Sequence, residues 1–467
     1  MKLPKFLSGK SEWWLLALLL AIFVALKIPT LAPRFADGWI YFYFGKLISE
    51  GATPYIDFYY SSPPLIPYFM GLLHSLFGFQ LAFAEVLPHL FSIADAILIF
   101  VLLRKKIGGF VFLAVGAYLF SFLNFATADY FSEAHPLTTL ALAGILFFEN
   151  REFFWSGIFF GLAGLTKLYG ILPAVFLPLL IIREPRNLAK FFGGIFISFG
   201  IPNLVFLAVV GREYLNFIFF NHLQKGVGIP KLRLWSFFAL RDFWLLLALA
   251  LPLCLAKNFK RFAVPLIAAG TFAVFYLIFK DIYYLYFKIF LALLVISLAF
   301  VLSGELRKVA SSKILAVVLV LLAVNSIFLL KNYFGSQIAI AQITNLDDIV
   351  ADVRAKSFAD ESIYGSFSIT PLVALLADRP IFRNYVDTNS KFIDLGVIDT
   401  QERAQELLAA HVPVVITKVY INPQTLATIG IQDVLPDDFF LQHCPDMRSF
   451  PIPADYESNA VIVWSCE

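Results

Sequence analysis

Long apolar runs dominate the first two-thirds of the chain, and charged residues recur mainly between them. A helix needs about 20 mostly apolar residues to cross the hydrocarbon core of a bilayer. The pattern predicts eleven such segments, several of them short. They lie at residues 13–31, 80–103, 109–127, 136–148, 153–166, 168–182, 191–210, 236–256, 262–279, 284–303 and 313–331. The first segment lacks a clear cleavage site and is followed by further spans, so we interpret it as a transmembrane helix and not as a cleaved signal peptide.

The pattern changes after residue 331, where Asp, Glu, Arg and Pro recur every few residues. Short apolar runs at Ser362–Gly365, Val412–Thr417 and Ala460–Trp464 are typical of buried strands. Asp399 and Thr400 followed by Gln401 to Ala410 predict a capped helix. The chain therefore divides into an α-helical, polytopic membrane domain at residues 1–331 and a soluble α/β domain at residues 332–467.

Composition supports a membrane protein. Hydrophobic residues make up 60% of the chain and charged residues only 15%, whereas a soluble protein is about half apolar and about a quarter charged. The net charge of +3 is too small to argue for nucleic-acid binding, and loop topology explains its sign better. We therefore expect membrane lipids, and no nucleic acid, among the partners.

Short loops rich in Lys and Arg indicate the orientation, because such loops stay on the cytoplasmic side. The basic residues counted for this are Lys2, Lys5, Lys10, Arg104, Lys105, Lys106, Arg183, Arg186, Lys190, Lys257, Lys260, Arg261, Arg307, Lys308 and Lys313. All of them fall on one side if eleven spans are present. We expect a plasma-membrane protein with a cytoplasmic N-terminus and an extracytoplasmic C-terminal domain. One span more or fewer would place the C-terminal domain on the cytoplasmic side instead.

Two long loops are expected on the outer side. The stretch from Arg34 to Gly78 begins with polar residues, continues as an amphipathic segment to Glu50, and contains an apolar segment at Leu65–Phe77. Thirteen residues are too few to span easily, so we expect this segment to form a helix in the outer interface. The second loop runs from Gly211 to Trp235. Loops of this kind suit a lipid-linked substrate.

The cysteines leave one question open. Cys254 lies in a predicted span, whereas Cys444 and Cys466 lie in the C-terminal domain. An oxidising exterior would permit these two to pair, and two isolated thiols are the alternative.

Motifs of common soluble enzymes, such as the phosphate-binding P-loop, are absent from the sequence. Polar residues at the outer ends of apolar segments are more informative. Asp37 lies just past the first span and could accept the proton of an attacking hydroxyl. Asp is also a favoured helix cap, so capping of the next segment is the alternative. Asp57 could be a second carboxylate, or it could serve the turn after Pro54.

A second polar group lies between the third and fourth predicted spans. It contains Asp129, Glu133 and His135. Charge at that depth is costly and is often functional. The carboxylates could hold a divalent cation or orient an acceptor, and interfacial solvation is the alternative. His135 precedes Pro136 and is interpreted as a capping or hydrogen-bonding group more readily than as a metal ligand.

Cations form the third group. Lys167 follows a Gly-rich apolar segment on the expected outer side and could neutralise a lipid phosphate. Snorkelling from a helix end is the commoner use of such a lysine. Lys280 has a similar place, with Asp281 beside it as a possible local ion-pair partner.

Taken in order, these features resemble the GT-C superfamily of membrane glycosyltransferases, in particular the protein O-mannosyltransferase and lipid A aminoarabinose transferase type. The matching residues are Asp37, Tyr41, Gly51, Pro54, Tyr55, Pro63, Pro64, Gly78, Glu133, Thr166 and Lys167. The likeness covers most of residues 10–335. Gly38 stands where many relatives have Glu, and Ser61 and Ser62 stand where the aminoarabinose branch has a Lys. These differences leave four candidates for the donor-phosphate ligand, namely Lys167, Lys280, Lys225 and Arg233.

The resemblance implies an inverting hexosyl- or pentosyltransferase. A polyprenyl-phosphate-linked sugar would be the donor, and a lipid, glycan or protein hydroxyl would be the acceptor. Asp37 would act as general base, with Glu133 as a second site residue. The resemblance also allows a divalent cation, Mg or Mn, near Asp37 and Glu133.

Two other classes of function compete with this interpretation. A transporter or lipid flippase would place charged residues near the middle of spans, whereas the polar residues singled out above lie mainly at outer helix ends. A non-catalytic scaffold would have no need for acidic residues in the first two outer loops.

Overall fold

The computed structural model describes residues 10–224, 229–254, 263–305, 312–336, 342–421, 428–431, 434–452 and 459–466. It comprises two compact units. Unit 1 contains Met1–Leu31, Val86–Val209 and Val227–Gly335, and unit 2 contains Ala32–Glu85, Val210–Gly226 and Ser336–Glu467. The predicted domain boundary after residue 331 stays a prediction.

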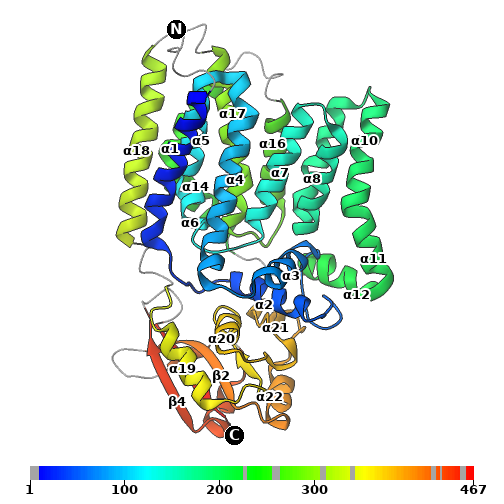
Figure 1. The fold of residues 1–467 in the computed structure, drawn as a ribbon, viewed down its shortest axis with the longest axis vertical. Coiled ribbons are helices and arrows are strands. Elements are labelled where there is room, and N and C mark those ends of the chain that lie inside the picture. Colours follow the sequence, from blue (N-terminus) through cyan, green and yellow to red (C-terminus); the bar gives the residue numbers. More distant parts are fainter. Residues whose placement is uncertain are drawn as a thin grey trace. The chain divides into compact units, whose positions relative to one another are not determined.

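Unit 1 is a helical bundle whose longer helices lie roughly along one common axis (Figure 1). Four helical segments of the described chain are long and apolar enough to cross a membrane: Glu12–Thr30, Leu81–Ile107, Pro185–Val210 and Val317–Phe334. The first comprises most of α1 (Lys10–Lys27) and the 3-10 turn η2 (Ile28–Thr30), the second is α4 (Leu81–Ile107), and the fourth lies in α18 (Ser312–Ser336). The third joins α10 (Pro185–Ile195) to α11 (Ile201–Val210) through a π-helical turn, η6 (Phe196–Gly200).

The other helices of unit 1 are shorter. They are α5 (Val111–Leu119), α6 (Phe122–Thr127), α7 (Ala134–Glu149), α8 (Phe153–Thr166), α9 (Pro173–Phe176), α14 (Lys231–Arg241), α15 (Phe243–Cys254), α16 (Ala263–Ile278) and α17 (Phe287–Glu305). The 3-10 turns η3 (Gly108–Phe110), η4 (Leu168–Ile171), η5 (Leu177–Ile181) and η9 (Tyr284–Tyr286) connect or extend them.

Helix is present in all eleven predicted segments, but the number of spans is not confirmed. The segment at 109–127 is divided between α5 and α6, because Ser121 caps a new helix by accepting from Asn124 N. The segment at 236–256 is interrupted at Asp242, between α14 and α15. The segment at 168–182 is a series of short turns in which Pro173 and Pro178 lie at helix starts. Each break shortens an apolar run below the length of a full span.

The basic loops are partly helical. Arg104, Lys105 and Lys106 form the last turn of α4, and α10 begins before Arg186 and Lys190. The predicted loop residues Lys2, Lys5, Lys257, Lys260, Arg261, Arg307 and Lys308 lie outside the described residues.

Unit 2 begins with two helices, α2 (Gly38–Ser49) and α3 (Leu65–Phe77), which confirm the predicted amphipathic and apolar segments of the first loop. The two helices pack closely, because Gly45 of α2 faces the backbone of Met70 on α3. The opposite side of α3 exposes large apolar side chains, namely Tyr68, Leu72, Leu76 and Phe77. The position of α3 in the membrane interface stays a prediction.

The predicted outer loop from Gly211 to Trp235 contains short helices in its described residues. It forms α12 (Arg212–Leu215), the π-helical turn η7 (Asn216–Phe220) and α13 (Asn221–Gln224), and α14 of unit 1 begins at Lys231. Aromatic residues stabilise this stretch within unit 2. Tyr214 is fully buried, with its ring 5.0 Å from that of Tyr55.

The rest of unit 2 is an α/β domain built on one mixed sheet. Its strands are β1 (Ile363–Gly365), β2 (Val414–Ile421), β3 (Thr428–Ile431), β4 (Asp446–Pro451) and β5 (Ala460–Ser465). Their order is β1-β2-β5-β4, with β3 paired to the far end of β2. The β1–β2 pair is parallel and the other pairs are antiparallel.

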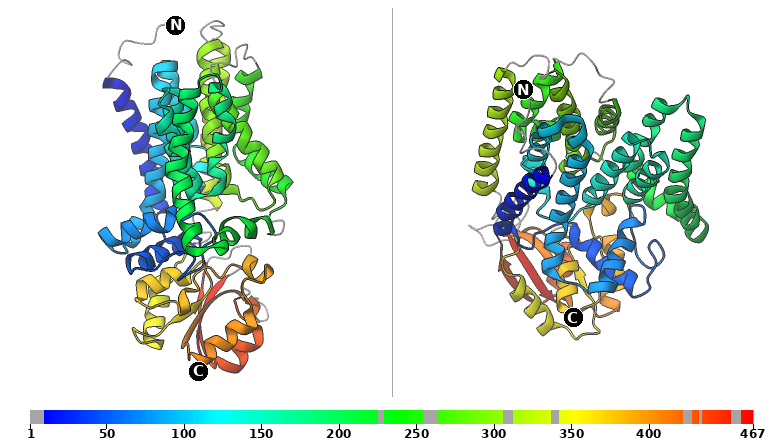
Figure 2. Two further views of the ribbon diagram at one scale, coloured as in Figure 1. Left: turned by 90° about the vertical axis from the view of Figure 1, so that its right-hand side faces the viewer. Right: turned by 45° about the horizontal axis from the view of Figure 1, so that its top comes forward.

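Helices cover both faces of this sheet, as the left view of Figure 2 shows. On one face, α19 (Leu346–Lys356) contacts β5 and α20 (Thr370–Ala377) contacts β1. On the other, α22 (Thr400–Ala409) and α23 (Asp437–His443) enclose a core that includes Val415, Val419 and Trp464. The short η10 (Phe382–Asn384) and α21 (Ser390–Asp394) lie between these elements in the chain.

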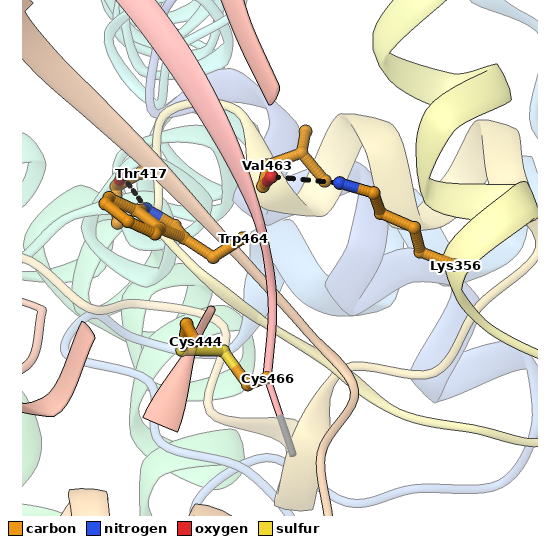
Figure 3. Close-up of a disulfide and its surroundings, with 6 residues drawn as sticks. All are labelled: Lys356, Thr417, Cys444, Val463, Trp464 and Cys466. Atoms are coloured by element: carbon orange, nitrogen blue, oxygen red, sulfur yellow. Dashed lines mark hydrogen bonds between the residues drawn. A yellow bond between two sulfur atoms is a disulfide. The ribbon is translucent and has the colours of Figure 1, made fainter. Parts of the chain in front are cut away.

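The predicted strands and helix of this domain are confirmed, apart from small shifts at their ends. The Asp399 carboxylate caps α22 by accepting from Gln401 N and Glu402 N. Cys444 and Cys466 form a disulfide, which settles the alternative left open by the sequence (Figure 3). Trp464, two residues before Cys466, donates from Nε1 to Thr417 Oγ1 at 2.8 Å in the same region.

Candidate active site

Asp37 lies at the N-cap position of α2 in unit 2, and its side chain is exposed. The side chain makes no hydrogen bond that caps α2, whereas the Asp37 carbonyl accepts from Ile40 N at 3.1 Å. The helix therefore starts without using the carboxylate, and the capping alternative is wrong for this side chain. An exposed carboxylate at the start of a buried helix suits proton abstraction from a substrate hydroxyl.

The other candidates of the first loop have structural surroundings. Tyr41 is half-buried one turn into α2. Tyr55 is buried at a positive φ of 71° and donates to Ser62 O at 2.6 Å, which closes the Pro-rich turn. Asp57 is exposed and accepts from Thr53 N at 2.6 Å. Asp57 therefore serves the turn, as the structural alternative predicted.

The second outer segment contacts this turn within unit 2. His222 Nε2 lies against Ser61 O, and Asn221 Nδ2 donates to Tyr59 OH at 3.4 Å. Burial raises the pKa of Tyr59, so this phenol stays neutral over the usual pH range. Asn221 and His222, which belong to the predicted loop at 211–235, therefore contact residues 59–62 and help to fix their position.

Glu133 and Lys167 form the clearest charged pair among the predicted site residues. Helices α7 and α8 are antiparallel neighbours joined by three residues, so the start of α7 and the end of α8 lie at the same end of the pair. Glu133 precedes α7 and Lys167 follows α8 in an extended conformation. Lys167 Nζ lies 2.6 Å from Glu133 Oε2, and the two side chains are 17% and 3% exposed.

Aromatic residues surround this pair. Lys167 Nζ lies 4.9 Å from the centroid of the Tyr286 ring, and the Tyr169 and Tyr286 rings are 5.2 Å apart. The sequence alternatives, solvation of Glu133 and snorkelling of Lys167, are therefore wrong. The ammonium is held beside a carboxylate and a ring face, an arrangement that fixes its position.

Asp129 has a different partner, which the sequence did not suggest. Its carboxylate forms an ion pair with Lys27 of α1, and Tyr333 of α18 also donates to it. Lys27 Nζ further donates to Tyr333 OH and to Phe125 O, each at 2.9 Å. This network connects α1, α18 and the segment before α7. It is a structural connection within unit 1.

His135 is fully buried at the start of α7. Its Nδ1 lies 3.2 Å from Ser132 N and 3.1 Å from Ser132 Oγ, which confirms the predicted hydrogen-bonding role.

The remaining donor-phosphate candidates are less enclosed. Lys280 and Arg233 are exposed, in the segment after α16 and in α14 respectively. Lys225 lies outside the described residues. Of the four cations, Lys167 is the one that the described structure holds in a defined polar environment.

A second buried pair was missed at the sequence level, although charges inside predicted spans are a recognised signal. Asp95 of α4 and Lys288 of α17 are both fully buried, with Nζ and Oδ2 3.6 Å apart. Tyr118 and Thr139 donate to Asp95 at 2.6 and 2.5 Å, so its oxygens are well satisfied.

The described residues contain no group of three or more His, Cys, Asp or Glu side chains that could hold a metal ion. Glu133 is already neutralised by an ammonium, and Asp37 belongs to the other unit. A cation at Asp37 and Glu133 stays a prediction.

Comparison with solved structures identifies the fold. ArnT from Cupriavidus metallidurans, solved bound to undecaprenyl phosphate, matches with a TM-score of 0.66 at 14% identity over 97% of this chain and 98% of that one. The oligosaccharyltransferase of Archaeoglobus fulgidus matches with a TM-score of 0.56 at 11% identity, over 97% of this chain and 81% of that one. Arabinofuranosyltransferase AftD from Mycobacteria matches with a TM-score of 0.55 at 13% identity, over 98% of this chain and 42% of that one. No protein-family model matches the sequence, and no curated protein matches it.

The chain thus has the fold of the GT-C glycosyltransferases, which confirms the resemblance stated from the sequence. With that fold and its apolar helices, it is a multi-pass membrane protein.

Proposed function

We propose that the chain is an inverting glycosyltransferase that moves a sugar from a polyprenyl-phosphate donor to an acceptor hydroxyl at the outer membrane surface. The observation that carries the proposal is the match to ArnT, which extends over nearly the full length of both chains and whose structure contains undecaprenyl phosphate. The donor sugar is a hexose or pentose, and the acceptor is a lipid, glycan or protein.

Asp37 is the proposed general base, because its carboxylate is exposed and does not cap α2. In the reaction, the acceptor oxygen forms a bond to the anomeric carbon while its proton passes to Asp37. The bond from that carbon to the phosphate oxygen breaks, and the polyprenyl phosphate leaves with the bonding electrons. Attack opposite the leaving group inverts the anomeric carbon.

Lys167 is the proposed partner of the donor phosphate. Negative charge develops on the leaving phosphate, and a fixed cation stabilises it best when no reorganisation is needed. Glu133 supplies that fixation through the 2.6 Å ion pair. The pair is neutral overall, so Lys167 contributes an oriented ammonium dipole and not a full net charge.

A transporter or flippase is the second candidate, and the Asp95–Lys288 pair is the observation that favours it, since it places charge inside a helix bundle. Besides Lys288, the hydroxyls of Tyr118 and Thr139 donate hydrogen bonds to Asp95. A carboxylate with this many fixed donors is typical of an ion pair that stabilises the fold. The enzyme proposal therefore remains preferred.

The test uses purified protein in lipid, a radiolabelled panel of polyprenyl-phosphate sugars and mixed acceptors. Removal of a general base typically costs about 10²–10⁴-fold in rate, so we expect Asp37→Asn to lose transfer to that extent while donor binding is retained. Asp57→Asn is the matched comparison, because it alters an exposed carboxylate of the same loop and its amide oxygen can still accept from Thr53 N.

Transfer by Asp37→Asn at the wild-type rate would keep the enzyme class and move the base elsewhere, with Glu133 next. Donor uptake into vesicles without any transfer would favour the transporter.

We further propose that a divalent cation near Asp37 and Glu133 is an alternative source of positive charge. Dialysis against EDTA tests this directly. Loss of transfer that Mg²⁺ or Mn²⁺ restores supports the cation, whereas unchanged transfer assigns charge stabilisation to the chain's own lysines.

A further inference from the structure

The segment that leads to Asp37 is held by residues of the C-terminal domain, all within unit 2. Ile343 N donates to Pro33 O at 2.9 Å, and Arg34 forms an antiparallel bridge with Gln342. These main-chain contacts fix the chain three to four residues before Asp37.

A side-chain contact lies closer to Asp37. Lys418 Nζ lies 4.8 Å from the centroid of the Phe35 ring, and Lys418 is only 6% exposed. Its main chain is rigid, because β2 pairs with β5 at this position and Lys418 N donates to Ser366 Oγ at 3.2 Å. Lys418 therefore projects from a fixed strand onto the ring two residues before Asp37.

The other side of Asp37 is held as well. Tyr43 of α2 is 1% exposed, and its phenol oxygen accepts from Ile381 N at 2.7 Å. Burial raises the pKa of Tyr43, so the phenol stays neutral across the usual pH range and the contact persists. Asp37 thus lies on a segment that the C-terminal domain holds on both sides.

From these contacts we propose that Lys418 is a positioning residue for Asp37 and acts through the Phe35 ring. The proposal rests on the proposed function, in which Asp37 is the general base. It gives the C-terminal domain a direct part in transfer, since a strand of its sheet sets where the base lies.

The chemistry of the contact supports a positioning role. Burying an ammonium costs free energy that an apolar side chain of similar length, such as Met, would not incur. The ammonium gains directional attraction to the ring face, which is stronger when the contact is desolvated. A Met at 418 would fill the same space without fixing the ring, and two residues of chain are too few to isolate Asp37 from a shift of Phe35.

The test compares variants that remove the contact with variants that keep it. Lys418→Met and Phe35→Leu remove the cation–π contact from either side, whereas Lys418→Arg and Phe35→Tyr retain a cation and a ring. Misplacement of a catalytic group by about 1 Å can cost about 10²-fold. We expect each removing variant to lower kcat about tenfold with the KM for the donor unchanged, and each retaining variant to stay within about twofold of wild type.

The double variant Lys418→Met/Phe35→Leu should be no slower than either single one, because both remove the same contact. Folded fraction is measured by size exclusion and thermal unfolding in the same lipid, and kcat is expressed per folded protein. Phe35→Leu serves as the independent probe where Lys418→Met does not fold.

A wild-type kcat per folded protein in both removing variants, with Asp37→Asn inactive, would overturn the positioning role and leave the proposed function standing. Full activity of Asp37→Asn would overturn Asp37 as the base, and the role of Lys418 with it. Equal losses in removing and retaining variants would assign Lys418 to packing alone.

Discussion

At the residue scale, the Glu133–Lys167 pair shows how the helical unit holds a buried charge. Removing ions from water is costly, and a pair offsets this only with good geometry and further contacts. Here the ion pair is 2.6 Å long and the Tyr286 ring lies beside the ammonium. Burying this ion pair costs desolvation free energy that an apolar pair would not incur. Such a cost is expected where the charged groups have a role in the proposed site.

The pair gives a prediction about stability. Lys167→Met leaves the Glu133 carboxylate buried without its ammonium, and loss of one partner of a buried pair costs about 3 kcal/mol or more. We expect a lower thermal unfolding temperature for Lys167→Met and for Glu133→Gln. The double variant Lys167→Met/Glu133→Gln should recover most of the loss, because no uncompensated charge remains.

Transfer activity separates the two roles of this pair. The double variant should be folded yet slow, since the phosphate has lost its cation. A double variant as active as wild type would remove Lys167 from the donor site, and additive losses of stability would show that the two side chains are not coupled.

Several candidate site residues could be predicted from the sequence, and the partners of others could not. Asp37, Glu133 and Lys167 stand out because they interrupt apolar runs at helix ends. The partner of Asp129 could not be found in this way, because Lys27 lies inside the first apolar segment and Tyr333 is 204 residues beyond Asp129. Lys418 carries no signal either, since it is one Lys in a short strand, and its contact with Phe35 depends on the tertiary fold.

At the scale of elements, the α2–α3 pair determines how the segment after Asp37 is held. A Cβ added at Gly45 would lie 2.7 Å from Met70 O and 2.8 Å from Met70 C, which are backbone atoms. Backbone cannot rotate away, so any side chain at 45 separates the helices.

Gly45→Ala should therefore destabilise the protein by about 1–3 kcal/mol, the usual cost of overpacking. Gly116→Ala in α5 is the matched control, because a Cβ there meets nothing within 4 Å. Ala is about 0.5–1 kcal/mol more favourable than Gly inside a helix, so the control should be neutral or more stable. Thermal unfolding in one detergent compares the two, and equal shifts would contradict close packing at Gly45.

Elements with a strong periodic pattern were predicted well, and those that depend on neighbours were not. The boundaries of α8 and α3 agree with the sequence to the residue, since polar or breaking residues flank both. Strand β4 was missed, because most of its residues are exposed and only Phe450 is buried within the run. The helical turns at 212–224 were missed because their buried side chains face partners distant in sequence, such as Tyr55 beside Tyr214.

At the scale of the whole molecule, the C-terminal residues cluster with the two predicted outer segments, Ala32–Glu85 and Val210–Gly226, in unit 2. That grouping fits the expectation that these three parts lie on one side of the membrane. The Cys444–Cys466 disulfide points the same way, because disulfides persist in oxidising compartments. We therefore propose that the C-terminal domain lies outside the cell and that the basic end of α4 lies inside.

Cysteine labelling tests this orientation. Leu441 is 86% exposed in α23, and Lys105 is exposed at the end of α4. Cys444 and Cys466 are paired and do not react with the label, and Cys254→Ser removes the third cysteine. In this background, Leu441→Cys or Lys105→Cys supplies the single reactive thiol. A membrane-impermeant maleimide added to intact cells should label Leu441→Cys and leave Lys105→Cys unlabelled until the cells are permeabilised. The reverse result would mean that one predicted span is missing or extra, and transfer would then take place on the cytoplasmic face, with the donor entering from the inner leaflet.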